Sequence, residues 1–209
     1  NKNIHDQWIS YCDCALIFDI GNFKRLGKIA DLISSNNIIA ASIDHHPSDD
    51  KFFNIRFLDI NSPATGYMVW QYFKHESFKL TYNTALSLYA ALIADTGSFR
   101  YNSTTPDCHV MAKEILELGI KPYNVFSWMY EQRTLPQIKL LAEVINSLNI
   151  SDEFASIKIT MRMLDKCGAT LDDVDGFTDF MRSIKGVEVS FMISEVSNSE
   201  FRINFRSRG

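Results

Sequence analysis

The stretch CALIFDIGNFKRLGKIADLISSNNIIAASIDHH, residues 14–46, holds the pattern that decides the fold. Residues 14–21 form a short apolar run that ends in an acid and a glycine, which is typical of a buried parallel strand. Residues 23–35 show apolar positions near helical spacing, and residues 37–44 form a second apolar run. Strand, helix and strand thus follow one another within about thirty residues, as in a βαβ unit. We therefore expect a parallel sheet covered by helices.

The remaining chain continues this pattern to about residue 150. The further elements expected there are a strand at 55–60 and helices at 64–75, 81–97, 103–120, 122–131 and 135–148. The helix at 103–120 is well delimited, with Thr105 as its N-cap, Pro106 at its first position and Gly119 at its end. After a polar break at 149–154, short strands should alternate with one helix at 171–184. The last two strands, 187–196 and 200–206, should form a hairpin that turns at 197–199.

Composition bounds the function. The 209 residues are 46% hydrophobic and 22% charged, with a net charge of −4 and a pI near 5.7. These values argue against a protein that coats long nucleic acid through a basic face, whereas a small anionic substrate held by metal ions remains compatible. We see no signal peptide and no apolar run long enough to cross a bilayer, so we expect a cytoplasmic protein whose four cysteines are free thiols.

Acids and histidines stand where the expected strands end. Asp19 ends the first strand, and Asp44, His45 and His46 end the second. Asp95 ends an apolar helix, just before a glycine. Ligands of open α/β sheets bind at the carboxyl ends of the strands, so these residues should converge at one edge. Three carboxylates beside an imidazole repel one another unless cations lie between them, and mixed Asp and His ligands suit Mn²⁺ or a similar ion.

Each residue also has a simpler interpretation. Asp19 could cap the following helix, and Asp95 could be an ordinary helix end. The Asp44-His45-His46 run could be a polar turn or a pH-sensitive loop. Taken singly, the residues leave these alternatives open, but their joint placement favours a metal site.

Four segments together resemble the DHH phosphoesterases. SIDHHPSDD (42–50) resembles the family signature, LIFDIGNFKRLG (16–27) the motif that precedes it, and ALIADTGSFRYNSTTP (91–106) the later aspartate motif. The segment at 186–209 resembles the start of the associated DHHA1 domain. Within the family, the RS near the end of the hairpin is most similar to the nano-RNase and phosphoadenosine-phosphate phosphatase branch. The likeness extends from about residue 14 to the end of the chain.

The resemblance implies a role for each matched residue. Asp19 matches an aspartate that bridges two metal ions, and His45 and Asp95 match further metal ligands. Asp44 and His46 match the members of the signature that support catalysis through hydrogen bonding and phosphate contact. The phosphate-binding side chains would be Arg100, Arg206 and Ser207. The implied cofactor is a pair of Mn²⁺ ions, with Mg²⁺ or another divalent ion as the alternative.

Two family features are missing from these residues, namely the first motif, for which His5-Asp6 is a poor match, and the glycine-rich loop after RS. We therefore expect an excerpt of a larger enzyme, inactive by itself. The resemblance implies an α/β fold with a parallel-sheet DHH domain at 1–132, a helical linker at 133–150 and a partial α+β DHHA1 substrate-binding domain at 151–209.

The function that the resemblance implies is metal-dependent hydrolysis of short single-stranded oligonucleotides, of a nucleotide 3′,5′-bisphosphate, or of both. A cyclic or linear dinucleotide phosphodiesterase is a close alternative, and a non-catalytic nucleotide-binding module is an alternative of another class. Pyrophosphatases also carry a DHH signature, but the helical linker and the RS hairpin argue against them. A homodimer remains open.

Overall fold

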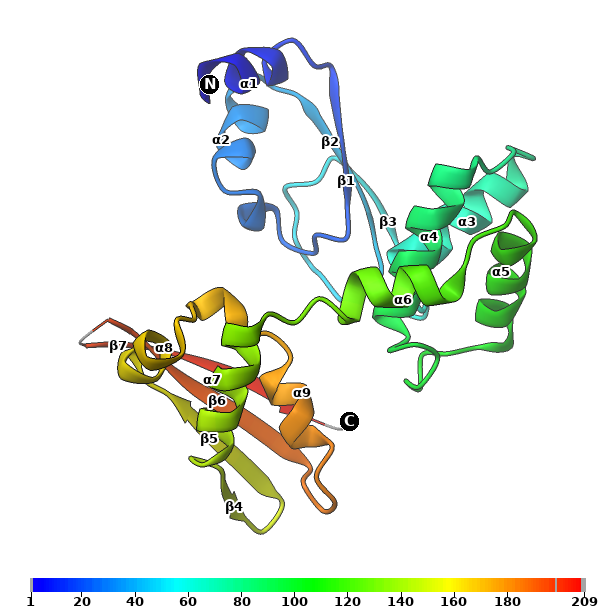
Figure 1. Ribbon diagram of the computed structural model, residues 1–209. Helices are drawn as coiled ribbons and strands as arrows, with labels where there is room; N and C mark the ends of the chain where they lie inside the picture. Colours follow the sequence, from blue (N-terminus) through cyan, green and yellow to red (C-terminus); the bar gives the residue numbers. More distant parts are fainter. Residues whose placement is uncertain (1, 198, 208–209) are drawn as a thin grey trace. The chain divides into compact units, whose positions relative to one another are not determined.

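The computed structural model describes residues 2–197 and 199–207, and the chain folds into two compact units. The first unit runs to Met129 and the second begins at Tyr130 (Figure 1). Each unit has hydrophobic core of its own. Within the described ranges, no helix combines the length and the apolar character that crossing a membrane requires.

A three-stranded parallel sheet opens the first unit. Its strands are β1 (Cys14–Phe18), β2 (Ile39–Asp44) and β3 (Ile55–Leu58), paired in the order β1-β2-β3. The 3-10 helix η1 (Phe23–Leu26) and helix α2 (Lys28–Ser35) connect β1 to β2, which confirms the expected βαβ unit. Helix α1 (Lys2–Ile9) precedes β1 and was not expected from the sequence. Because the strands are parallel, all three end at the same edge of the sheet.

The two faces of this sheet differ in burial. On one face, Ile17 and Ala40 pack in a core with Phe23 and Ile33, which come from η1 and α2. The opposite face keeps these apolar side chains exposed: Leu16, Phe18, Ile39, Ile55 and Phe57. The strands were expected to be buried, but within the described residues they are covered on one face, because successive side chains point to opposite sides of a sheet.

Four helices complete the first unit: α3 (Thr65–His75), α4 (Tyr82–Asp95), α5 (Pro106–Glu117) and α6 (Pro122–Tyr130). All four agree with the expected ranges to within a few residues. Helix α5 begins as the sequence predicts, with Thr105 in extended conformation as the N-cap and Pro106 in the first turn. Buried side chains of α3, α4, α5 and α6, including Trp70, Leu92 and Met111, share one core.

Helices α3 and α4 approach each other closely at Gly66. A Cβ atom placed on Gly66 would lie 2.6 Å from the Cβ atom of Ala91, a distance that real contacts do not reach. A glycine is therefore required for this approach of the two helices. Because Ala91 and Asp95 are four residues apart, they lie on the same side of α4. The crossing at Gly66 thus sets where Asp95 lies relative to the start of α3.

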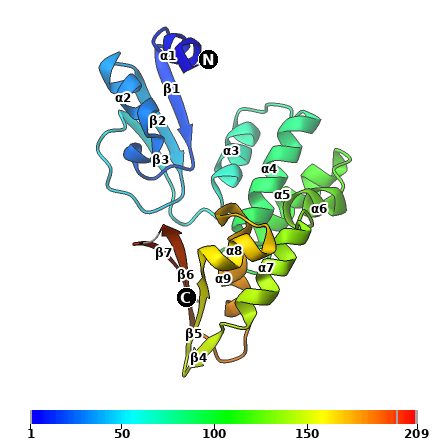
Figure 2. The ribbon, with the colours of Figure 1, turned by 60° about the vertical axis from the view of Figure 1, so that its left-hand side comes forward.

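The second unit is a four-stranded mixed sheet with helices on one face (Figures 1 and 2). Its elements are α7 (Leu135–Ile145), β4 (Asn149–Ser151), β5 (Phe154–Ile159), α8 (Met161–Cys167), η2 (Leu171–Val174), α9 (Phe177–Arg182), β6 (Val189–Ser197) and β7 (Glu200–Ser207). Strands β5 and β6 are parallel, and the two outer pairs are antiparallel. The expected final hairpin is therefore present as β6 and β7, although residue 198 of its turn lies outside the described residues.

Two expectations need correction here. The single helix predicted at 171–184 is two segments, η2 and α9, which are separated at Gly176 in left-handed conformation. Helix α8 occupies residues that were taken for strand, because the Thr160 side chain accepts a hydrogen bond from the Met163 N–H and caps the new helix.

Helix α7 also contributes Leu140 to the core of this unit. The division into domains at 1–132, 133–150 and 151–209 stays a prediction.

Candidate metal centre

Asp19 lies just beyond the end of β1, in a backbone conformation that is uncommon for a residue with a side chain. Its φ angle is +62°, and its N–H donates to the Ile43 carbonyl of β2 at 3.1 Å. One carboxylate oxygen, Oδ1, accepts a hydrogen bond of 2.7 Å from the Thr65 hydroxyl. Such left-handed residues cost free energy and gather at functional sites. Asp19 is thus held both by strand pairing and by a side chain from α3.

Asp44, the last residue of β2, is buried and holds His46 in place. Its Oδ1 accepts the His46 backbone N–H at 2.8 Å and lies 2.8 Å from His46 Nδ1. A carboxylate only accepts hydrogen bonds, so Nδ1 carries a proton and Nε2 is the nitrogen that faces away from Asp44. Asp44 therefore orients the more exposed histidine of the pair.

His45 is oriented in the same way by a backbone carbonyl. Its Nδ1 lies 3.1 Å from the Ser62 carbonyl, which can only accept, so Nδ1 is the protonated nitrogen. The other nitrogen, Nε2, is buried and has no hydrogen-bond partner among the described residues. It lies 3.6 Å from Asp19 Oδ1 and 3.7 Å from Asp95 Oδ2, distances too long for a hydrogen bond. A buried imidazole nitrogen without a hydrogen-bond partner therefore faces two carboxylates.

Asp95 brings a second carboxylate to this point from the C-terminal end of α4. Burial, the largest cause, raises the pKa of its carboxyl above the ordinary value. His45 acts in the opposite direction, while the nearby Asp19 carboxylate raises the pKa further. The carbonyl end of a helix also disfavours a negative charge. The protein thus places an anion where an anion is unfavourable unless a cation joins it.

The donor set fits a divalent metal ion. Ligand atoms of Asp19, His45 and His46 lie within 4.8 Å of one another. Asp95 Oδ2 lies 3.7 Å from His45 Nε2. An ion between them would receive the orphan His45 lone pair and would offset the two carboxylate charges. Carboxylate and imidazole ligands suit Mn²⁺ and similar ions rather than a thiolate-type zinc site.

The turn that follows Asp95 is tightly wound. Gly97, Ser98 and Phe99 all have positive φ angles, between 54° and 65°. The Thr96 hydroxyl accepts the Phe99 N–H at 3.1 Å, and Arg100 Nε donates to the Gly97 carbonyl at 2.7 Å. Arg100 is thereby anchored to the turn that follows Asp95 and is exposed, and its phosphate-binding role stays a prediction.

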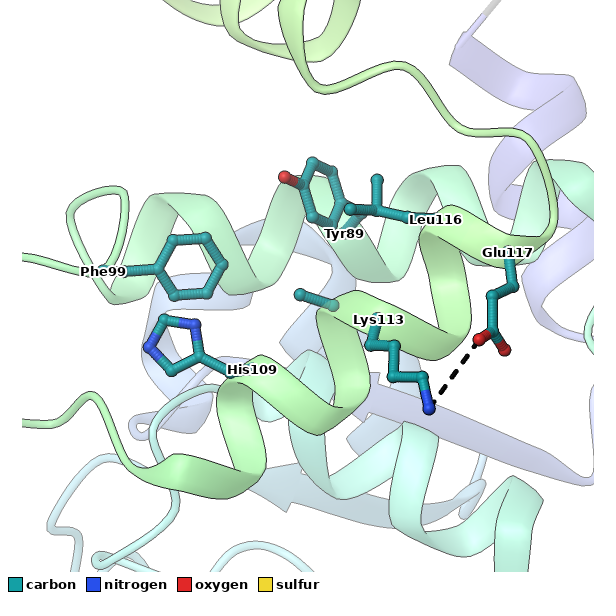
Figure 3. A pocket seen from close by; sticks show the side chains of 7 residues that line it. Tyr89, Phe99, His109, Lys113, Leu116 and Glu117 are labelled. Atoms are coloured by element: carbon teal, nitrogen blue, oxygen red, sulfur yellow. Dashed lines mark ion pairs between the residues drawn. The ribbon is translucent and has the colours of Figure 1, made fainter.

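A hollow lies elsewhere in the first unit, between α4 and α5 (Figure 3). It has a volume of about 570 Å³ and is lined by residues that include Tyr89, Phe99, His109, Lys113 and Glu117. The His109 ring stacks on the Phe99 ring, with 4.8 Å between centroids. Lys113 pairs with Glu117 on the same helix at 3.8 Å. None of these side chains belongs to the Asp–His cluster, although Phe99 follows Asp95 closely in the chain.

The structure thus brings Asp19, Asp44, His45, His46 and Asp95 together in the first unit. Arg206 and Ser207 lie at the end of β7 in the second unit, and their proposed substrate contacts stay predictions. Sequence reasoning missed Ser62 and Thr65, which hold His45 and Asp19. Their only signal in the sequence is that SPAT, residues 62–65, spans the start of a helix, where serine and threonine are common for capping alone.

No protein-family model matches this chain. Three curated relatives are bifunctional oligoribonucleases and PAP phosphatases named NrnA, the second of them labelled probable. The chain is 26% identical to the Bacillus subtilis protein over 80% of its own length and 54% of that protein. It is 24% identical to the Streptococcus mutans protein over 92% and 61%, and 26% identical to the Thermus thermophilus protein over 80% and 50%. The chain spans about half the length of these relatives.

A solved structure shows the same fold. An exopolyphosphatase-related protein from Bacteroides fragilis superimposes with a TM-score of 0.92 at 23% identity, over 100% of this chain and 62% of that one. The chain therefore shares the α/β fold of that protein, and its Asp–His cluster could hold a metal ion. More particularly, the chain is a distant homologue of the bifunctional oligoribonucleases and PAP phosphatases, which confirms the resemblance seen in the sequence.

Proposed function

We propose that this chain carries the metal centre of a phosphoesterase that hydrolyses short oligonucleotides, a nucleotide 3′,5′-bisphosphate, or both. The observation that carries the proposal is the buried, unpartnered Nε2 of His45, which faces the carboxylates of Asp19 and Asp95. The distant homology to oligoribonucleases and PAP phosphatases gives the substrate class. The second unit would supply the remaining substrate contacts.

Asp19, His45 and Asp95 would hold the metal. Divalent ions bound in this way lower the pKa of a bound water and neutralise charge on a phosphate ester. Mn²⁺ is the ion we expect, since the ligands are oxygen and imidazole nitrogen.

The other residues of the edge would act on the substrate. His46 is half-exposed, and its Nδ1–H donates to Asp44, which fixes the orientation of the ring. With a proton on Nε2 as well, the ring would donate a hydrogen bond to a phosphate oxygen. Arg100 would add positive charge beside Asp95. Arg206 and Ser207 on β7 would hold a terminal phosphate, because arginine binds phosphate through two parallel hydrogen bonds. In the complete gene product, Arg206→Ala should raise KM and leave kcat nearly unchanged.

Substrate length follows from charge. A net charge of −4 provides no continuous basic track for a long strand. Affinity would then come from one phosphate at the metals and from one or two neighbouring nucleotides. We expect dimers to pentamers to be degraded to mononucleotides much faster than a strand of about twenty nucleotides.

The test is Mn²⁺-dependent turnover across an oligonucleotide length series, on a nucleotide bisphosphate, and on cyclic and linear dinucleotides. It uses the chain and the complete product of its gene, with His45→Ala as the inactivating variant and His109→Ala as a matched histidine outside the cluster. Equal rates on short and long strands would favour an exonuclease of another type. Preference for a cyclic dinucleotide would move the proposal to that class. Mn²⁺-independent nucleotide binding without turnover would support the non-catalytic module.

A further inference from the structure

The segment SPAT, residues 62–65, supports two residues of the metal centre at once. Ser62, Ala64 and Thr65 are each 6% exposed or less, and Pro63 is also buried. The Ser62 carbonyl accepts from His45, and the Thr65 hydroxyl donates to Asp19. Segments that only connect a strand to a helix usually lie exposed on the surface, whereas this one is buried beside two candidate metal ligands.

The Thr65 hydroxyl donates its hydrogen bond to Asp19. A hydroxyl has one proton to donate, and here the donation runs to Asp19 Oδ1 at 2.7 Å across 46 positions of sequence. The helix does not need this side chain as a cap, because its N-cap is Ala64 and Thr65 is its first residue. The bond leaves the second lone pair of Oδ1 and both lone pairs of Oδ2 for a metal ligand role.

The surroundings keep this donor in place. The Ser62 hydroxyl donates to the Ala64 carbonyl at 3.1 Å, and the Ser62 N–H donates to the Asp59 carbonyl at 3.1 Å. The γ-methyl group of a threonine restricts rotation about χ1. One residue further on, the close contact between Gly66 and Ala91 ties this end of α3 to the helix that carries Asp95. Thr65 therefore lies where three segments with candidate ligands meet: the ends of β1 and β2, which carry Asp19 and His45, and helix α4, which carries Asp95.

We propose that Thr65 is a positioning residue of the metal centre, whose hydroxyl holds the Asp19 carboxylate beside His45 in the geometry that binds the ion. This inference rests on the proposed function, since it assigns the hydrogen bond to a metal site. Asp19 itself stands in a left-handed backbone conformation, so its carboxylate direction depends on what the side chain contacts. Residues that orient metal ligands in this way typically change metal affinity by about 10–100-fold when they are removed.

The experiment compares Mn²⁺ binding to wild type, Thr65→Val and Thr65→Ser by calorimetry and by the electron paramagnetic resonance signal of free Mn²⁺. Valine keeps the shape and removes the hydroxyl, and we expect it to weaken Mn²⁺ binding by about 10-fold or more. Serine keeps the donor and should restore affinity to within about threefold of wild type. Thr65→Ala provides a second variant without the hydroxyl and should behave like valine.

The matched control is Thr178→Val, because Thr178 is as buried as Thr65, at 5% exposed, but belongs to the second unit. This variant should leave Mn²⁺ affinity unchanged, and melting curves in a chelator verify that every variant is folded. Wild-type affinity in folded Thr65→Val and Thr65→Ala would overturn the positioning role, as would a serine variant as weak as valine. By contrast, a folded wild type that binds no Mn²⁺ would overturn the proposed function itself.

Discussion

The strand edge that carries the Asp–His cluster and the hollow between α4 and α5 are two regions of the first unit. They differ in whether their polar side chains have partners. The hollow is large, at about 570 Å³, but its charges pair with each other and its imidazole is stacked on a phenyl ring. The strand edge, by contrast, buries His45 Nε2 and Asp44 Oδ2 without partners among the described residues. Buried polar atoms that lack partners are costly and require an explanation. Buried polar atoms without partners therefore indicate the candidate site better than the volume of a hollow does.

The largest expected difference between the two regions is in Mn²⁺ affinity after a histidine is removed from each. We expect His45→Ala to reduce Mn²⁺ affinity by about 100-fold or more, because a ligand is lost outright rather than misoriented. His109→Ala removes a histidine from the hollow and should leave Mn²⁺ affinity unchanged. Calorimetric titration of both variants measures the difference. Equal weakening in the two variants would remove the distinction between the regions.

The second effect concerns the helix crossing that joins α3 to α4. Gly66→Ala would place a Cβ atom 2.6 Å from Ala91, so the helices must move apart. We expect the free energy of unfolding to fall by about 1–3 kcal/mol. Mn²⁺ affinity should fall as well, since Thr65 and Asp95 would lose their relative placement. Denaturant unfolding and Mn²⁺ titration test this prediction. A destabilised variant with wild-type affinity would show that the crossing supports the fold but not the site.

A third effect separates stability from metal binding at Asp95. Its raised pKa means that the folded state favours the protonated carboxyl, so this stabilisation is present at low pH and is lost as pH rises through the raised pKa. In the metal-free protein at neutral pH, Asp95→Asn should therefore raise the free energy of unfolding by about 0.5 kcal/mol, a small value because the carboxyl is partly exposed. The same change should weaken Mn²⁺ binding by about 10-fold. A variant that gains neither stability nor a binding defect would contradict this assignment.

The smallest effect lies in the loop after the histidines. The Phe52 N–H donates to Asp50, as does the Phe23 N–H, and these bonds together with Arg56 and Lys24 lower the pKa of the Asp50 carboxyl. Stability from this ionised group is present above the ordinary aspartate pKa and is lost as pH falls through the lowered value. We expect Asp50→Asn to cost about 0.5 kcal/mol at neutral pH and nothing in strong acid. Melting curves of both proteins against pH measure the convergence, and a pH-independent difference would refute it.

Much of the site could be predicted because parallel strands end together. Once residues 14–21 and 37–44 are taken as neighbouring parallel strands, Asp19 and the Asp44-His45-His46 run must meet at one edge. Asp95 was expected at the same edge because it ends an apolar helix before a glycine, and it lies 3.7 Å from His45 Nε2 in the structure. Sequence periodicity did not reveal that α8 breaks the expected strand region. A local cap at Thr160 decided that element, and apolar content alone does not distinguish short helices from strands.

The sequence by itself determined the order of helices and strands in the first unit from β1 onward and the residues that end β1 and β2, because periodicity and strand polarity act locally along the chain. Only the tertiary structure decided which nitrogen of His45 carries the proton, which hydroxyl holds Asp19, and that α7 packs in the core of the second unit. Each of these depends on groups far apart in sequence. Thr65 reaches Asp19 only after α3 has docked, and that docking depends on the space left at Gly66, which no local pattern records.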